Sequence, residues 1–129
     1  MSRRLISSGG PWESVAGYSR AVVVGDSCWV SGTTDAGPDG TSRHPGDVAA
    51  QAWAVFDIIG RALEDAGFSF TDVVRTRMFV VDIAASSNAV SRVHGEVFGV
   101  IRPAATMVEV AALIDPSLLV EIEVEAHRG

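Results

Sequence analysis

The first clear pattern of apolar positions along the chain consists of two short runs, each of the length of a β-strand. Residues 20–24 and 27–32 are rich in β-branched and aromatic side chains and lie on either side of Gly25-Asp26. A two-residue step of this kind between such runs is typical of a hairpin turn, so we predict two antiparallel strands here. Residues 33–47 are rich in Gly, Asp, Pro, Ser and Thr and predict a loop.

The period then changes to that of a helix. Apolar side chains between residues 48 and 66 recur at steps of three and four, which places them on one helical face. Asp47 is positioned to cap the N-terminus of this helix, and Gly67 is positioned to end it. A second helix is predicted to start at residue 86 or 87 and to run to Phe98.

Three further segments alternate with a period of two and predict strands over residues 73–82, 105–112 and 119–126. A turn at residues 114–117 separates the last two, and an extra N-terminal strand is left open. The order β-β-α-β-α-β-β predicts an α+β fold, in which one mixed sheet carries two helices on one face. A chain of 129 residues suits one domain, so we expect a single domain over residues 1–129.

The sheet face turned away from the predicted helices has a mixture of side chains. It would carry Phe79, Val81 and Met107 among arginines and glutamates at positions 75, 77, 109, 121, 123 and 125. A solvated sheet face is normally polar, whereas this one is partly apolar and partly charge-paired. We therefore expect the face to be buried against further copies of the chain in an oligomer.

Charge and composition exclude several classes of function. The ten basic residues are all Arg, so the chain has no Schiff-base lysine, pyridoxal-phosphate anchor or P-loop lysine. The formal net charge of −6 disfavours nucleic acid as a partner, because phosphate binding needs a basic face. No apolar targeting segment and no run of membrane-spanning length is present, so we expect a cytoplasmic protein without a membrane partner.

Three carboxylates, Glu121, Glu123 and Glu125, occupy alternate positions and project from one strand face. One interpretation is a ladder neutralised by water or arginines; the other is that one glutamate orients or deprotonates a water molecule at a subunit edge. Arg75 and Arg77 also share a face. They either neutralise these glutamates or clamp an acidic ligand through the planar guanidinium.

The remaining side chains that could carry chemistry are scattered. The histidines at positions 44, 94 and 127 have no metal-ligand spacing, so we expect no metal site. Cys28 lies in an apolar strand and is interpreted as a buried, inert thiol. Tyr18, the only tyrosine, either packs at the edge of the core or makes a hydrogen bond to a ligand.

Several segments resemble the motifs of the RidA family, also known as YjgF or L-PSP. Residues 17–21 (Gly-Tyr-Ser-Arg-Ala) and 29–32 (Trp-Val-Ser-Gly) resemble its G-P-Y-S-Q-A and F-V-S-G-Q motifs. Residues 103–110 (Pro-Ala-Ala-Thr-Met-Val-Glu-Val) are similar to P-A-R-S-x-V-E-V, and residues 119–123 (Leu-Val-Glu-Ile-Glu) match L-V-E-I-E. Residues 47–51 resemble the opening of the family's first helix, so the likeness covers nearly the whole chain.

This resemblance implies a chorismate-mutase-like fold with a ferredoxin-like β-α-β-β layer, assembled as a homotrimeric barrel with three clefts between subunits. It also implies hydrolysis of reactive enamines or imines to 2-keto acids and ammonia, without a metal or organic cofactor. In that mechanism an arginine clamps the substrate carboxylate and a glutamate positions the attacking water. A tyrosine and backbone groups complete the cleft.

The resemblance also implies roles at particular positions. Glu121 would handle the water and Tyr18 would orient the ligand, as the two catalytic residues. Ser31 and Gly32 match the family's Ser-Gly and would contact the substrate through the backbone. Thr33 stands where the family has Gln and would line the same cleft.

The clamp arginine is missing from the corresponding motif. Its position holds Ala105, and the following serine is replaced by Thr106, which would still supply a polar contact. Loss of a buried arginine–carboxylate contact costs roughly 30-fold to several thousand-fold in affinity. Either the substrate differs or another arginine replaces the clamp; Arg77 and Arg102 are the candidates, with Arg20 as a third and weaker one.

The leading hypothesis is therefore a RidA-family protein that binds a small carbonyl- or imine-type metabolite in a cleft between subunits. As an enzyme it would be a hydrolase acting on C=N bonds, an imine or enamine deaminase that needs no cofactor. The alternative is a trimeric metabolite-binding or accessory protein without catalysis, because Ala105 replaces the clamp. The ribonuclease activity attached to the family name is disfavoured by the acidic charge.

Overall fold

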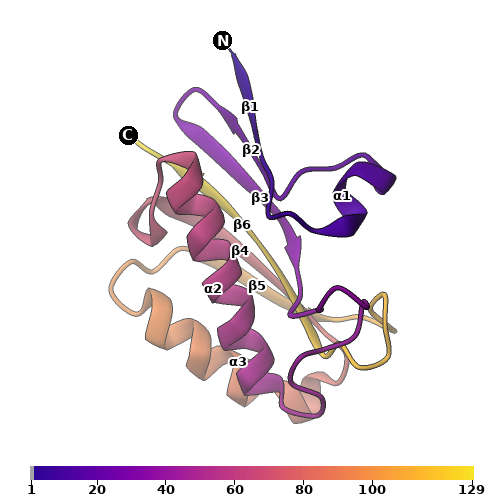
Figure 1. The fold of residues 1–129 in the computed structure, drawn as a ribbon. Coiled ribbons are helices and arrows are strands. Elements are labelled where there is room, and N and C mark those ends of the chain that lie inside the picture. The colour runs from indigo at the N-terminus through magenta and orange to yellow at the C-terminus, as the bar shows by residue number, and fades with distance from the viewer. Residues whose placement is uncertain (1) are drawn as a thin grey trace.

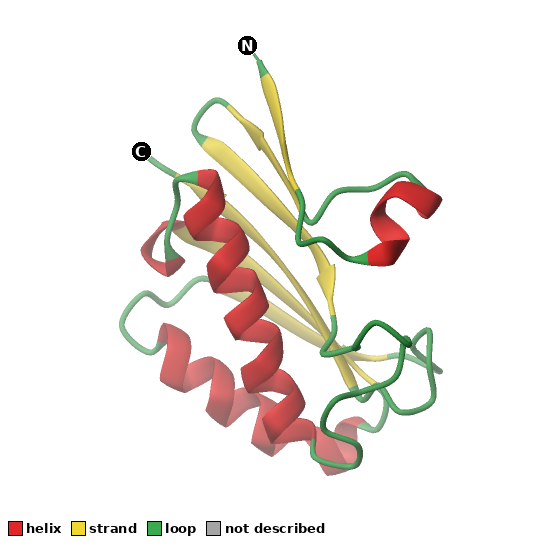
Figure 2. Ribbon diagram, viewed as in Figure 1, coloured by secondary structure: helices red, strands yellow, loops and turns green. Residues whose placement is uncertain are grey.

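The computed structural model describes residues 2–129, which form one six-stranded mixed sheet with two long helices on one face (Figure 1; Figure 2). The strands are β1 (Arg3–Ile6), β2 (Ala21–Val24), β3 (Ser27–Thr33), β4 (Val73–Val80), β5 (Ala104–Glu109) and β6 (Val120–His127). The helices are α1 (Pro11–Ala16), α2 (Val48–Ala66) and α3 (Ile83–Phe98), with a 3-10 turn η1 (Phe70–Asp72). The predicted α+β fold is confirmed.

The strands follow the order β1-β2-β3-β6-β4-β5 across the sheet. β4 and β5 run parallel, and the other neighbouring strands run antiparallel. β1 supplies the N-terminal strand that the sequence left open. The short helix α1 and the turn η1 are elements that the apolar pattern did not indicate, because both are shorter than the window over which a helical period is visible.

Local signals account for the hairpin and for the first long helix. Gly25 adopts a φ of 57° and turns β2 directly into β3. The side chain of Asp47 accepts a hydrogen bond from the Ala50 N–H at 3.0 Å and caps α2. Gly67, in the left-handed region with a φ of 85°, ends the same helix. Both predictions are confirmed.

The second long helix starts earlier than predicted, at Ile83 and not at residue 86 or 87. Asp82, which the sequence pattern assigned to the end of the preceding strand, is the N-cap of α3. Its side chain accepts a hydrogen bond from the Ala85 N–H at 3.3 Å, and β4 already ends at Val80. A capping aspartate and the last polar position of a strand look alike in sequence, which explains the error.

The predicted orientation of β5 is corrected by its register with β4. Ala105 and Met107 are paired with Thr76 and Met78, whose side chains face the helices. Met107 consequently packs against the core, and the expectation that it lies on the opposite face is wrong. Thr106 is on the face turned away from the helices, so this residue and its neighbour Ala105 point to opposite sides of the sheet.

The core lies between the sheet and helices α2 and α3. Phe56 from α2 packs edge-to-face on Phe98 from α3, with ring centroids 5.6 Å apart, and Phe70 extends the cluster at 5.5 Å from Phe98. β6 contributes Val120, Ile122 and Val124, all buried, on the same side. The alternate positions of β6 therefore project from the opposite face, as the sequence pattern predicted.

We call the sheet face opposite α2 and α3 the open face, since neither helix covers it (Figure 2). Its charged side chains come from β4 and β6. Large apolar side chains accompany them, and Trp29 is 45% exposed in the single chain. Within residues 2–129, no helix is long and apolar enough to cross a membrane. The same residues contain no group of three His, Cys, Asp or Glu side chains arranged to hold a metal ion.

Candidate functional site

One glutamate on β6 differs from the other two in what lies opposite it on β4. The register pairs Glu125 with Arg75, Glu123 with Arg77 and Glu121 with Phe79. Arg77 Nη1 lies 3.2 Å from Glu125 Oε1 and 3.5 Å from Glu123 Oε1. Two of the three carboxylates therefore form the arginine-paired ladder that the sequence left as one interpretation, and Glu121 stands outside it.

A β-bulge in β3 brings the backbone of this strand over Glu121. Val30 is paired with Val124, whereas Thr33 is paired with Ile122, so β3 contains one residue more than β6 between these two pairs. Such an extra residue bends the strand and redirects its side chains. Ser31 and Gly32 lie inside the bulge, and Gly32 lies next to the carboxylate of Glu121.

Glycine is required at position 32 because the Glu121 carboxylate approaches the backbone closely, and not because of the backbone angles. A Cβ atom at this position would lie 3.1 Å from the Glu121 carboxyl carbon and would overlap Oε2 of the same group. Because glycine has no Cβ, the carboxylate packs directly against the β3 backbone. The strand thereby holds the position of the Glu121 carboxylate.

The surroundings of Glu121 favour its neutral form. Burial raises the pKa of the Glu121 carboxyl; the positive charge of Arg20 lowers it, the negative charge of Glu123 raises it, and the net shift is upward. A carboxylate whose pKa lies above the ordinary range of glutamate is a better proton acceptor than an exposed one. Perturbed titratable groups of this kind are typical of functional sites.

Arg20 is the cation whose charge acts on this carboxylate. It lies immediately before β2 and opposite Ser31, whose N–H donates to the Arg20 carbonyl at 2.9 Å. Its Nη1 donates to the carbonyl oxygen of Gly32 at 3.0 Å and to Thr33 Oγ1 at 2.7 Å. The side chain is only 8% exposed. From the sequence alone, Arg20 is a weaker candidate than Arg77 and Arg102. The register of the two-residue hairpin nevertheless places Arg20 beside Ser31.

Tyr18, which follows the C-cap of α1, reaches the same cluster. Gly17 ends that helix in the left-handed conformation, and the N–H groups of Gly17 and Tyr18 both donate to the Glu13 carbonyl at 2.9 Å. This cap places the Tyr18 ring beside Arg20, whose guanidinium carbon is 5.6 Å from the ring centroid. Tyr18 is 41% exposed in the single chain.

The hydroxyl groups of the bulge are engaged in holding its shape. Ser31 Oγ donates to the Ser19 carbonyl at 2.6 Å, and Thr33 Oγ1 donates to the Ser31 carbonyl at 2.8 Å. Thr33 also accepts the hydrogen bond from Arg20. These side chains therefore position the backbone and the guanidinium of the site.

The other predicted site residues lie elsewhere on the chain. Ala105 and Thr106 are on β5, which is separated from β6 by β4, a distance of roughly 10 Å at the usual strand spacing. Thr106 Oγ1 accepts a hydrogen bond from Arg75 Nη2 at 2.8 Å. Arg102, with a left-handed φ of 58°, is exposed in the loop before β5. One chain therefore carries two separate groups of predicted site residues.

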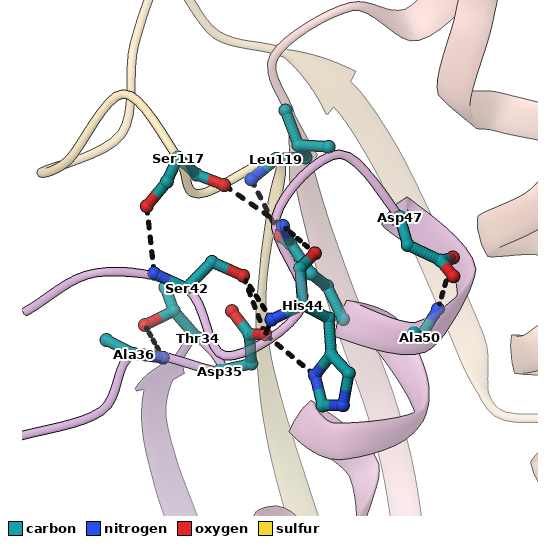
Figure 3. A network of polar contacts seen from close by, with 10 residues as sticks. Thr34, Asp35, Ala36, Ser42, His44, Asp47, Ala50, Ser117 and Leu119 are labelled. Carbon is teal, nitrogen blue, oxygen red and sulfur yellow. Dashed lines mark hydrogen bonds and ion pairs between the residues drawn. The ribbon is translucent and has the colours of Figure 1, made fainter.

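A polar network, which the sequence did not indicate, ties down the loop that follows the bulge (Figure 3). The carboxylate of Asp35 is fully buried, and its Oδ2 accepts hydrogen bonds from Ser42 Oγ at 2.8 Å and from the His44 N–H at 3.1 Å. His44 Nδ1 lies 3.1 Å from the same oxygen. Loops rich in Asp, Ser and Thr commonly form such local contacts, but only the folded chain reveals the partners.

Gln51 connects this loop to the start of β6. Its Nε2 donates to the carbonyl oxygens of His44 at 3.1 Å and Ser117 at 3.0 Å, and its Oε1 accepts from the Leu119 N–H at 2.9 Å. Ser117 and Leu119 immediately precede β6 (Figure 3). The fully buried amide thus holds both chain segments that flank the bulge and Glu121.

A shallow hollow on the open face adjoins the cluster. Its volume is about 210 Å³, and its lining includes Trp29, Ser31, Arg77 and the two paired glutamates of β6. Glu121 is not among its lining residues, so this hollow lies beside the carboxylate and does not contain it. Apolar and charged side chains therefore line the surface next to the cluster.

The sequence matches known proteins over nearly its full length. The profile of the family described as Endoribonuclease L-PSP matches residues 11–128. A human 2-iminobutanoate/2-iminopropanoate deaminase is 33% identical over 127 residues, which cover 98% of this chain and 91% of that protein. An uncharacterised protein of Streptomyces coelicolor is 37% identical over 126 residues, covering 98% and 92% of the two chains.

Solved structures agree with these matches. A member of the YjgF/YER057c/UK114 family from Mycobacterium tuberculosis has a TM-score of 0.89 and 47% identity, with 98% of this chain and 100% of that chain covered. The YjgF gene product of E. coli has a TM-score of 0.82 and 30% identity, with 98% and 99% covered. The chain therefore belongs to the Endoribonuclease L-PSP family, the YjgF or RidA family that its motifs resemble.

Proposed function

We propose that this protein hydrolyses the C=N bond of a small 2-imino acid, or of the enamine that tautomerises to it, to a 2-keto acid and ammonia. The observation that carries the proposal is the Glu121 carboxylate, held against Gly32 outside the arginine-paired ladder, with its pKa raised. The human relative named as a 2-iminobutanoate/2-iminopropanoate deaminase supports the reaction class.

The chemistry assigned to each group is simple. Glu121 accepts a proton from a water molecule, whose oxygen forms a bond to the imine carbon, and passes this proton to the imine nitrogen, which leaves Glu121 ionised again. The tetrahedral carbinolamine then loses ammonia: the C–N bond breaks, the remaining oxygen forms the keto group, and its proton passes through Glu121 to the leaving nitrogen. The Tyr18 hydroxyl donates a hydrogen bond that orients the ligand.

A second copy of the chain would complete the site. Glu121 lies on β6 and Tyr18 in the loop before β2, whereas Ala105 and Thr106 lie on β5 at the sheet edge, so we expect a cleft that uses both groups to need two chains. The apolar side chains on the open face support burial in such an assembly. We propose a homotrimer, for which light scattering would give three times the chain mass of 13.5 kDa.

The proposal is tested by following the decay of 2-iminobutanoate released in situ by a pyridoxal-phosphate-dependent dehydratase. Wild type is expected to accelerate the loss of imine absorbance well above the spontaneous rate. Ala105→Arg serves as the companion variant, since it restores the side chain that the family motif has at this position.

A silent wild type with an active Ala105→Arg variant would contradict the proposal. That result would favour the alternative function, a metabolite-binding protein whose cleft is intact but whose ligand is not a simple imino acid. The alternative rests on Ala105, which stands where the family motif has its clamp arginine.

In the same assay we expect kcat/KM to fall at acidic pH. The reaction needs Glu121 ionised, so kcat/KM should fall as the pH drops through the pKa of this carboxyl, which burial raises from its ordinary value. Glu123→Gln removes a neighbouring negative charge that raises this pKa, so the fall should move to lower pH. A fall at an unchanged pH in Glu123→Gln, after subtraction of spontaneous hydrolysis, would argue against Glu121 as the titrating group.

A further inference from the structure

Arg20 is a buried cation without a carboxylate partner. Its side chain is 8% exposed, and none of the salt bridges among residues 2–129 involves it. Its Nε is fully buried and makes no hydrogen bond within the same residues. The carboxylates of Glu121 and Glu13 act on this charge without an ion pair. A desolvated cation that lacks a carboxylate in direct contact costs folding free energy, so it is expected to serve a ligand.

The guanidinium is nevertheless held in one orientation. Nη1 is fixed by the Gly32 carbonyl and Thr33 Oγ1, and the Tyr18 ring lies 5.6 Å from the guanidinium carbon. Nη2 makes no hydrogen bond with residues 2–129. A planar fork that is oriented before binding loses little side-chain entropy when it meets a carboxylate.

The same guanidinium is next to the proposed reacting group. Gly32 contacts both residues: its carbonyl oxygen binds Arg20, and its Cα hydrogens face the Glu121 carboxylate. The influence of Arg20 on the pKa of Glu121 agrees with this proximity. A small ligand whose reacting carbon lies at Glu121 is therefore also beside Arg20.

We propose that Arg20 binds the carboxylate of a small 2-oxo or 2-imino acid, so that anion recognition comes from the same chain as Glu121. The choice of ligand class rests on the proposed function, whereas the assignment of Arg20 rests on its burial and contacts. The other candidates fit less well: Arg77 is engaged by two glutamates, and Arg102 lies in the loop before β5, a strand that β4 separates from Glu121 on the same chain.

The test measures binding and does not require turnover. 2-Oxobutanoate and its neutral isostere 2-oxobutanamide are titrated into the protein by calorimetry or ligand-observed NMR. Wild type should prefer the acid by at least about 30-fold, the loss expected when a buried charge pair is broken. Arg20→Met should bind acid and amide equally, and Arg20→Lys should retain part of the preference. Arg61→Met, on the exposed side of α2, changes the net charge equally and should behave as wild type.

Each outcome decides the assignment. Equal binding of acid and amide by wild type, no detectable binding of the acid, or an acid preference that survives in Arg20→Met would overturn it. If Arg20→Met does not fold, as judged by circular dichroism, Thr33→Val takes its place. This variant removes the hydroxyl that anchors Nη1 at nearly constant shape and should lose part of the preference. An acid preference that depends on Arg20, in a protein that does not accelerate imine decay, would support Arg20 and contradict the deaminase function.

Discussion

Glu121→Gln should abolish most turnover while making the folded protein more stable at neutral pH. The amide cannot accept a proton from water, and loss of a general base typically costs about 10²- to 10⁴-fold in rate. Imine decay assays on wild type and the variant measure this loss directly. The substitution keeps the size of the side chain, so the packing against Gly32 is retained.

The expected gain in stability follows from the raised pKa. A carboxyl whose pKa is higher in the folded state than in the unfolded state stabilises the fold below its unfolded pKa, and this contribution is lost as the pH rises through the folded value. At pH 7 the wild type therefore carries a charge that burial disfavours, and the glutamine variant does not. Its melting temperature should be higher at pH 7, and the difference should shrink as the pH falls toward the raised pKa.

Glu125→Gln is the matched control for this experiment. It makes the same change on the same strand, but Glu125 is paired with Arg77 at 3.2 Å. Turnover should stay close to that of wild type, and the melting temperature should not rise. If both variants lose turnover equally, or if Glu121→Gln leaves the imine rate unchanged, Glu121 is not the base.

Gly32→Ala should lower turnover by about 100-fold with little loss of stability. The added Cβ meets the end of the Glu121 side chain, which must move by rotation of its own bonds. A misplacement of about 1 Å in a catalytic group can cost about 10²-fold in rate, whereas moving the end of a flexible side chain costs little folding free energy. The imine assay and thermal unfolding together separate these two effects.

Gly95→Ala on α3 is the control, because a Cβ there meets nothing within 4 Å. This variant should be as active as wild type and up to about 1 kcal/mol more stable, owing to the higher helix propensity of alanine. Combining Gly32→Ala with Glu121→Gln supplies the second check. If Glu121 transmits the effect of Gly32, the double variant should be no slower than Glu121→Gln alone.

Local patterns in the sequence were sufficient for much of the fold. The Gly25-Asp26 turn set the hairpin and its register, and with it the position of Arg20 opposite Ser31. Asp47 and Gly67 marked the ends of α2, because caps depend on residues within one turn. The start of α3 was predicted wrongly, since Asp82 suits both a strand end and a helix cap.

The candidate site depended on contacts between distant segments. The alternation along β6 put three glutamates on one face, but all three are equivalent in that pattern. Which of them has no arginine opposite it on β4 is decided by that strand, more than forty positions away in sequence, through the pairing of Glu121 with Phe79. The orientation of Ala105 was likewise set by the parallel register of β5 with β4, which no local period specifies.

For this protein, the sequence by itself determined most of the strands and long helices, the side of β6 that carries the glutamates, and the family, because periodicity, caps and motifs are properties of neighbouring residues. Only the tertiary structure decided which carboxylate stands apart, which arginine accompanies it and why Gly32 is a glycine. Those features arise where the bulge in β3 pairs with β6 and where Gln51 makes hydrogen bonds to two loops. Strand register and burial are set jointly by segments far apart in the chain, so they appear only when the chain is folded.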